Sequence, residues 1–228
     1  MCSQTGDGQM VQLTRAGTAV SASAGDVEHL RRQFDRLPCI LLPSLLDPGL
    51  LHVIQRHIDA ATFNPKTHEG IGTEICLTEN QAVYTLRFLA NDPQLFEVIQ
   101  QITGCGRIGC FDGRVYRMVP GSQHYDSWHD DMIEHRMIGM SINLSRTIYS
   151  GGIFQMRDRN SLQIIHETAN TGFGDGIIFR LAPHLQHRIT EVDGSVPKTA
   201  FAGWFRSEPD FYADLKNAPQ QPLTEAPG

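Results

Sequence analysis

Two histidines and one aspartate in the second half of the chain have the residue types and spacing of a metal-binding set. His129 and Asp131 are two residues apart, and His187 follows much later in the sequence. On an extended strand, residues two apart point to the same side, so an imidazole and a carboxylate can meet one ion from a single short segment. Two imidazoles and one carboxylate on one side of an ion suit Fe(II) and leave its opposite coordination positions open.

Neighbouring residues compete for these roles, because the chain contains ten histidines and most histidines in proteins serve other purposes. Asp130 adjoins Asp131, but the alternation of a strand points its side chain to the other side. His184 falls in a predicted turn, whereas His187 begins a predicted strand, which favours His187 as the ligand. His124 lies in the loop before the His-x-Asp pair and is the weaker candidate.

Helical periodicity characterises the first part of the chain after an irregular start. Apolar residues recur at helical spacing, and the Asp-Pro pairs at 47–48 and 92–93 are typical of helix starts. We predict a short strand at 39–42 and a polar loop at 63–78. The predicted helices cover 26–37, 48–61, 80–90 and 93–103, the last ended by Gly104.

After Gly104 the periodicity shortens to alternation, and glycine-rich turns come close together. Helices followed by many short strands indicate a mixed α+β, mainly β protein, with a jelly-roll or cupin-like core and the N-terminal helices packed on one face. The predicted strands cover 108–119, 128–132, 136–144, 153–157, 176–180, 186–192 and 198–206. The expected organisation is a flexible segment over 1–25, a single domain over 26–216 (helical part 26–104, β core 105–206) and a flexible tail over 217–228.

Composition and charge narrow the classes of function. The chain has 228 residues, 40% hydrophobic and 19% charged, which fits a soluble globular domain. Its net charge of -6 argues against nucleic acid as a partner, and no apolar stretch is long enough to span a membrane. The start of the chain lacks the pattern of a secretory signal, and five cysteines without a Cys-x-x-Cys pair predict reduced thiols, so we expect a cytoplasmic protein. No pattern in the sequence sets the oligomeric state.

Several short motifs surround the His-x-Asp pair in a fixed order. They are Tyr116 to Gly121, Gly151-Gly152-Ile153-Phe154, Gly174 to Phe179, His187 to Val192, and Lys198 leading to Gly203-Trp204-Phe205. In this order and spacing, residues 108–206 resemble the Fe(II)/2-oxoglutarate-dependent oxygenases, in particular their prolyl-4-hydroxylase-like branch. The resemblance implies a double-stranded β-helix, which is a kind of jelly roll, and Fe(II) held by His129, Asp131 and His187.

The resemblance also implies that Lys198 binds the far carboxylate of 2-oxoglutarate and that Tyr116 donates a hydrogen bond to this cosubstrate. Lys198 lies eleven residues after His187, across the predicted turn at 193–194, so neighbouring antiparallel strands can bring both side chains to one cavity. A buried lysine is costly unless an anion pairs with it. Arg188 and Arg206 are alternative anchors, and a solvated Lys198 without this role is the other alternative.

Three further residues are candidates for the substrate pocket. Trp204 shares strand parity with Lys198 and is expected either to form a pocket wall or to belong to the core. Asn143 and Gln155 are polar strand residues that are expected to contact the main substrate. The segments 63–78 and 122–128 are candidate lids over this pocket.

The activity implied is the hydroxylation of an unactivated C–H bond with Fe(II), 2-oxoglutarate and O2. Family halogenases lack the carboxylate ligand, so the presence of Asp131 favours hydroxylation, with desaturation or ring formation as related outcomes. We expect a small-molecule substrate, such as an amino acid or a natural-product intermediate. The alternatives are a protein hydroxylase of the prolyl type and a non-catalytic, cupin-like sensor that holds another divalent metal.

Overall fold

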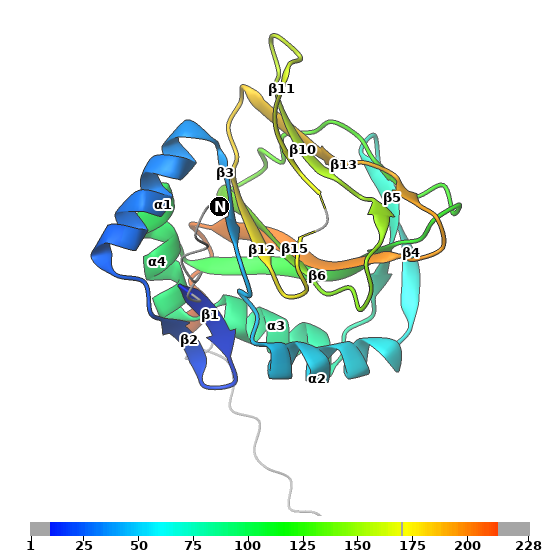
Figure 1. Cartoon of the computed structure of the whole chain (residues 1–228), viewed down its shortest axis with the longest axis horizontal. Coiled ribbons are helices and arrows are strands. Elements are labelled where there is room, and N and C mark those ends of the chain that lie inside the picture. The colour runs from blue at the N-terminus through cyan, green and yellow to red at the C-terminus, as the bar shows by residue number, and fades with distance from the viewer. Residues whose placement is uncertain (1–9, 170, 214–228) are drawn as a thin grey trace, which may run out of the picture.

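Two β layers face each other, and helices cover the outer side of the larger layer (Figure 1). This computed structural model describes residues 10–169 and 171–213. The smaller layer lies at the top of the view, the larger layer crosses its centre, and the helices lie below and to the left. In the described part of the chain, no helix has the length and apolar character needed to cross a bilayer.

The helices begin and end where the local sequence dictates. Side chains at the N-caps accept hydrogen bonds from the first turn, as Asp47 does from the amide of Leu50 at 2.8 Å. The helix Pro93–Thr103 ends at Gly104, whose φ of 67° is the left-handed conformation that favours glycine. The helices are α1 (Ala24–Arg36), α2 (Pro48–Asp59), α3 (Gln81–Ala90) and α4 (Pro93–Thr103).

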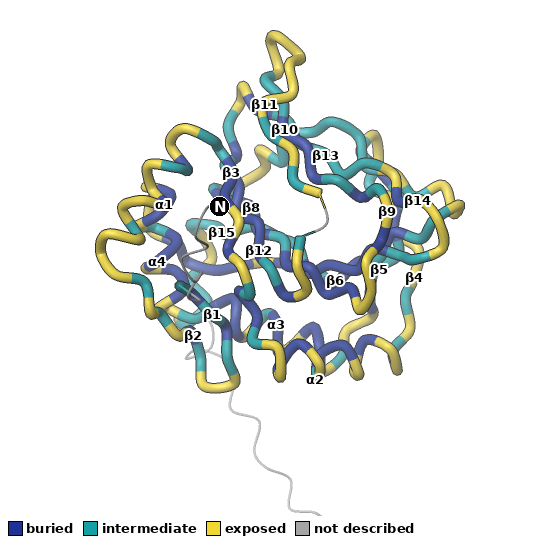
Figure 2. Tube along the Cα trace, viewed as in Figure 1, coloured by how far each residue is buried: buried dark blue, intermediate teal, exposed yellow. Residues whose placement is uncertain are grey.

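The larger sheet is antiparallel and carries the hydrophobic core on its outer face. Phe201 and Phe205 of its central strand are fully buried there, against residues such as Phe34 of α1 and Ile99 of α4. Figure 2 shows the middle strands of this sheet mostly in the colour of buried residues. In spatial order the strands are β3 (Cys39–Leu42), β12 (Gly176–Arg180), β8 (Arg136–Asn143), β15 (Lys198–Arg206), β6 (Cys110–Met118), β5 (Gly72–Leu77) and β4 (Phe63–His68), with β7 (Tyr125–Asp126) paired to β5.

The smaller sheet closes the other side of the barrel. Its strands are β11 (Ile164–Thr168), β10 (Phe154–Asp158) and β13 (Leu185–Ile189), and a short pair joins β9 (Ser150–Gly151) to β14 (Val192–Asp193). Along the chain, β8 lies in the larger sheet, β10 and β11 in the smaller, β12 in the larger, β13 in the smaller and β15 in the larger. This alternation is the winding of a double-stranded β-helix, and the predicted fold class is therefore confirmed.

The start of the chain is more ordered than the sequence suggests. Within the segment 1–25, which we expected to be flexible, β1 (Val11–Thr14) and β2 (Gly17–Val20) form an antiparallel hairpin. Leu13 is fully buried, and its amide donates to the carbonyl of Leu45 at 2.6 Å. The hairpin is held by long-range contacts, which local composition does not reveal. Residues 1–9 and the predicted tail at 217–228 lie outside the described residues.

The segment 63–78 is also not the polar loop that its composition predicts. It folds into the β4–β5 hairpin, which extends the larger sheet from Phe63 to Leu77. Exposed polar side chains occupy much of β4, so its sequence resembles a loop although its backbone pairs along six residues. As a result, this segment forms one wall of the barrel.

Candidate metal centre

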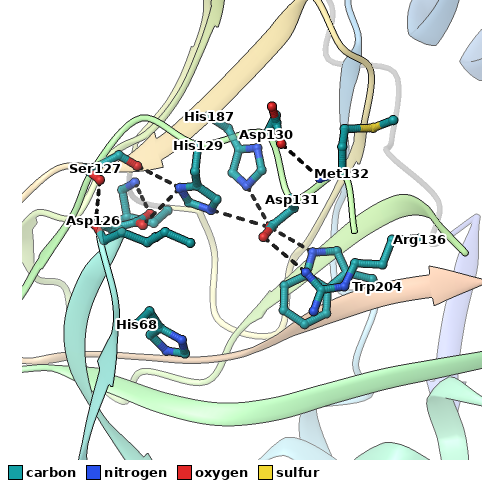
Figure 3. Close-up of polar contacts among 12 residues, drawn as sticks. His68, Asp126, Ser127, His129, Asp130, Asp131, Met132, Arg136, His187 and Trp204 are labelled. Atoms are coloured by element: carbon teal, nitrogen blue, oxygen red, sulfur yellow. Dashed lines mark hydrogen bonds and ion pairs between the residues drawn. The ribbon is translucent and has the colours of Figure 1, made fainter. Parts of the chain in front are cut away.

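The side chains of His129, Asp131 and His187 converge on one point (Figure 3). One oxygen of Asp131, Oδ2, lies 3.2 Å from Nε2 of His187 and 3.5 Å from Nε2 of His129. All three ligand atoms lie within 4.8 Å of one another. Ligand atoms that share one ion at about 2.1 Å lie roughly 3 Å apart, so small side-chain movements would complete a metal site here.

The backbone brings His129 and Asp131 together in a different way from the one predicted. Residues 128–132 do not form a regular strand; His129 makes only an isolated bridge to His187, with N–O distances of 3.1 and 2.8 Å. Asp131 then has a φ of 55°, in the left-handed region that non-glycine residues rarely occupy. The chain must leave the smaller sheet here to reach β8, and this turn aims the carboxylate back at the imidazoles. A strained backbone of this kind is common at functional sites.

The ring of His129 is oriented by the segment that precedes it. Its Nδ1 lies 2.7 Å from the backbone carbonyl of Ser127, which can only accept a hydrogen bond. In the neutral ring Nδ1 therefore carries the proton, and Nε2 is the nitrogen that can bind a metal ion beside Asp131. His187 is buried against Phe179, with ring centroids 4.7 Å apart. Behind Phe179 lies Gly139, where a Cβ would overlap the phenyl ring.

The carboxylate of Asp131 is held from the side opposite the histidines. The indole Nε1 of Trp204 donates to Oδ2 at 2.8 Å, and Nη1 of Arg136 lies 3.3 Å from Oδ1 (Figure 3). The guanidinium of Arg136 lies over the Trp204 ring, 3.5 Å from its centroid. Trp204 is thus both a wall of the cavity and a partner of the predicted carboxylate ligand.

The electrostatics of the cluster favour a cation between these side chains. Burial opposes ionisation of Asp131, but hydrogen bonds from His129 and His187 outweigh it and hold the pKa of the carboxyl well below its usual range. Burial also lowers the pKa of His129, but its contacts with Asp131 and Asp126 raise it to about 9. Both shifts mean that positive charge is stabilised at this point, and the donor set fits a divalent transition metal.

We expect Trp204→Phe to weaken metal binding without unfolding the protein. Phenylalanine keeps the aromatic wall but removes the donor to Asp131, and the loss of such a supporting hydrogen bond typically lowers metal affinity about 10- to 100-fold. Titration with Fe(II) under anaerobic conditions measures the effect. Trp128→Phe is the matched control, because the chain's only other tryptophan lies between Arg157 and Arg188. Equal affinities for both variants would contradict this role.

The site opens into a cavity of about 210 Å³ inside the barrel. Of the residues that the sequence singled out, the cavity is lined by His129, Asp131, His187, Tyr116 and Trp204. Tyr116 is buried, and burial raises the pKa of its phenol far above the ordinary value, so the hydroxyl stays protonated. It is therefore a hydrogen-bond donor facing the site.

Lys198 lines a smaller pocket on the same inner face, and Ser141 lines both spaces. The Lys198 side chain is buried, and its Nζ donates to the carbonyl of Gly152 at 2.7 Å. Nζ also lies 5.6 Å from the centre of the Tyr149 ring. Within the described residues, no carboxylate forms an ion pair with Lys198, and burial lowers its pKa to about 8. Asp126 acts on the ammonium only at longer range, and its direct contacts are to neutral groups, so the position suits an anionic ligand.

The two alternative anchors point elsewhere. Arg188 lies on the outer face of the smaller sheet, where its Nε donates to Gln155 at 2.8 Å. Arg206 lies at the far end of β15 and contacts Asp112 and Glu134 at 3.8 and 3.7 Å. Of the three candidate anchors, Lys198 is the one that lines a pocket on the inner face.

Two predicted substrate contacts are corrected. Gln155 follows Phe154, which lines the cavity, so the alternation of β10 puts Gln155 on the outer face beside Arg188 and Glu167. Asn143 does point inward, but it lines only the smaller pocket and not the large cavity. Its amide donates to the carbonyl of Thr171 at 2.8 Å and its oxygen accepts from the amide of Ser145, which is a structural use of both groups.

Sequence reasoning missed a charged group in the same cavity. His68, Glu74 and Arg114 line it from β4, β5 and β6, and Arg136 lines it beside Trp204. The first two fall in the segment 63–78, which was expected to be a loop and a candidate lid, so no strand parity indicated that their side chains enter the cavity. Arg114 lies two residues before Tyr116, so the alternation of a strand points both side chains to the same side. This parity could have indicated that Arg114 lines the cavity.

Comparisons with known proteins reveal similarity in structure alone. No family profile matches the sequence, and no curated protein matches it. Among solved structures, a prolyl-4-hydroxylase from Pseudomonas putida is 17% identical, with a TM-score of 0.61 over 80% of this chain and 100% of that one. An oxidoreductase of the 2OG-Fe(II) oxygenase family from Burkholderia pseudomallei is 14% identical, with a TM-score of 0.60 over 82% of this chain and 94% of that one.

A third structure is a non-heme α-ketoglutarate-dependent epimerase from nogalamycin biosynthesis. It is 15% identical, with a TM-score of 0.57 over 88% of this chain and 94% of that one. The three matches cover most of both chains, so the similarity extends over the helical part as well as the barrel. The protein therefore shares the fold of these structures.

Proposed function

We propose that this protein is an Fe(II)- and 2-oxoglutarate-dependent oxygenase that hydroxylates an unactivated C–H bond. His129, Asp131 and His187 would hold the iron, and Lys198 would hold the far carboxylate of 2-oxoglutarate. The observation that carries the proposal is the ligand set of His129, Asp131 and His187, together with a buried lysine on the same inner face that forms no ion pair within the described residues. When bound, Fe(II) with its cosubstrate supplies the oxidising chemistry.

The side chains of the barrel then have separate tasks. Trp204 and Arg136 fix the orientation of the Asp131 carboxylate, and the carbonyl of Ser127 fixes the tautomer of His129. Tyr116 offers a phenol donor in the wall of the large cavity. Apolar residues, including Met118, complete the wall and exclude water from the cosubstrate.

The buried lysine also favours an oxygenase over a sensor protein that has the same fold and only binds a metal. A protein that only binds a metal gains nothing from a buried ammonium, whose desolvation is unfavourable. For the main substrate, the cavity volume of about 210 Å³ supports a small molecule. The solved structures with this fold include both a prolyl-4-hydroxylase and a natural-product epimerase.

The direct test is the conversion of 2-oxoglutarate to succinate. The purified protein is given Fe(II), 2-oxoglutarate, a reductant and O2, and succinate is measured by mass spectrometry. We expect slow turnover without a main substrate, which stops when a chelator removes the iron. Binding of 2-oxoglutarate to the anaerobic Fe(II) protein is measured in parallel. A protein that neither binds nor converts 2-oxoglutarate would overturn the proposal.

The affinity for 2-oxoglutarate should fall as pH rises through about 8. Lys198 has a pKa lowered to about 8 by burial, and a bound carboxylate raises the pKa again. Below pH 8 the lysine is protonated and binds 2-oxoglutarate. Above pH 8 it loses its proton, and the KM for 2-oxoglutarate approaches a tenfold rise per pH unit. The pKa of nearby Tyr149 is raised to about 12, so this phenol does not titrate in the same range.

Initial rates with metal-saturated protein between pH 7 and 9 measure this dependence. Lys198→Arg keeps its charge throughout and serves as the control, since its profile should be flat. A KM that is independent of pH in the unsubstituted protein would place the anchor at another residue.

A further inference from the structure

A second charged cluster lines the same cavity, apart from the metal ligands. Nε of Arg114 lies 2.6 Å from Oε1 of Glu74, and Nε2 of His68 lies 2.9 Å from the same oxygen. The Glu74 side chain is only 10% exposed. Figure 3 shows His68 facing the histidine and aspartate cluster from the opposite side of the site. The cluster therefore lies within the space that a bound molecule would occupy.

The geometry of the pair leaves one atom on each partner for a ligand. Within the described residues, the contacts to the Glu74 carboxylate all go to Oε1, including that from Cys76 at 3.3 Å. Arg114 uses Nε for Glu74 and places Nη2 3.4 Å from His68. Among the residues that the structure describes, Oε2 of Glu74 and Nη1 of Arg114 have no hydrogen-bond partner. Neither atom is fully buried, which fits their exposure to the cavity. An acceptor and a charged donor thus stand side by side on one wall.

Arg114 is also close enough to the metal ligands to hold a reacting molecule. Its guanidinium carbon lies 5.7 Å from the centroid of the Trp204 ring, and Trp204 donates to Asp131. A single aromatic side chain therefore separates the charged pair from the carboxylate ligand. The charged pair and the metal ligands thus line one cavity, on either side of this ring.

We propose that Glu74 and Arg114 select a free amino acid as the main substrate, and this inference rests on the proposed oxygenase function. Arg114 binds the α-carboxylate, and Glu74 binds the α-ammonium group. A buried ion pair adds little to stability on its own, so its place in a cavity wall needs another reason. A zwitterion forms a charged hydrogen bond with Arg114 and another with Glu74, whereas a singly charged ligand forms only one of the two.

Binding to the anaerobic Fe(II)–2-oxoglutarate protein tests the proposal, because turnover is then blocked. The probes are the standard L-amino acids, and for each one that binds, its α-amide and its N-acetyl derivative, measured by calorimetry. We expect at least one amino acid to bind, and both of its blocked forms to bind about 10- to 100-fold more weakly, since each loses one charged hydrogen bond. These comparisons need no variant.

Two variants assign the discrimination to the pair. Arg114→Gln should bind the free acid and its amide equally, and Glu74→Gln should bind the amino acid and its N-acetyl form equally. Arg146→Gln is the matched control, because Arg146 forms an exposed pair with Asp59 at 2.6 Å on the helical side of the molecule. It should keep the full preference for the zwitterion.

Three results would overturn the inference. The first is that no amino acid binds, and the second is that free and blocked forms bind equally. The third is that Arg114→Gln needs a higher concentration of 2-oxoglutarate, which would assign the pair to the cosubstrate. Titration with 2-oxoglutarate alone separates these results from failure of the oxygenase proposal. A protein that binds 2-oxoglutarate but no amino acid contradicts only the substrate inference.

Discussion

Asp131→Ala should abolish Fe(II) binding at micromolar metal and, with it, all conversion of 2-oxoglutarate. Asp131 contributes the only carboxylate of the ligand cluster, and its Oδ2 faces both imidazoles. Loss of a residue that merely supports a ligand costs about 10- to 100-fold in affinity, so loss of the ligand itself should cost at least about 100-fold. Anaerobic titration with Fe(II) and succinate formation give the two readouts.

Asp130→Ala is the matched control for this variant. Asp130 has the same charge one residue earlier, but its carboxylate turns outward to Arg159 at 3.0 Å and caps the amide of Met132. Its replacement should leave metal affinity and turnover unchanged. Circular dichroism excludes unfolding as the cause of any loss. An Asp131→Ala protein that still binds Fe(II) normally would remove this residue from the ligand set.

The fold was predictable from the sequence because its β core is strongly patterned. In β15, alternate residues face the helices and the barrel interior, so Phe201 and Phe205 are buried in the core while Lys198 and Trp204 point inward. The chain order of helices before strands then indicated the architecture. The β1–β2 and β4–β5 hairpins were missed, because pairing with distant segments, such as the contact of Leu13 with Leu45, stabilises them.

The site was only partly predictable, for the same physical reason. Residue type and spacing identified His129, Asp131 and His187, yet the strand geometry assumed for the first two is absent, and a left-handed Asp131 brings the carboxylate into place. Gln155 was chosen as a polar strand residue, without regard to the face that its side chain occupies, and it lies on the outer face. The Glu74–Arg114 pair depends on the pairing of β5 with β6, where Cys76 opposes Tyr116, and nothing local encodes that register.

Lys198→Met should separate the cosubstrate role of this residue from a structural one. Methionine fills a similar volume without charge, so the affinity for 2-oxoglutarate should fall about 30- to 5,000-fold, the usual loss when one partner of a buried charge pair is removed. Stability should move the other way. Burial lowers the pKa of Lys198 below its unfolded value, so the protonated side chain destabilises the folded protein at neutral pH, and the variant should melt at a temperature at least as high.

The measurements are 2-oxoglutarate titration of the anaerobic Fe(II) protein and thermal unfolding without cosubstrate. Lys66→Met is the matched control, because Lys66 is exposed on β4 and should affect neither quantity. Lys198→Arg should retain part of the affinity, since its guanidinium restores the charge but not the shape. If Lys198→Met bound 2-oxoglutarate normally, the anchor would lie elsewhere; if it instead unfolded at low temperature, the contact with Gly152 would be the reason for the lysine.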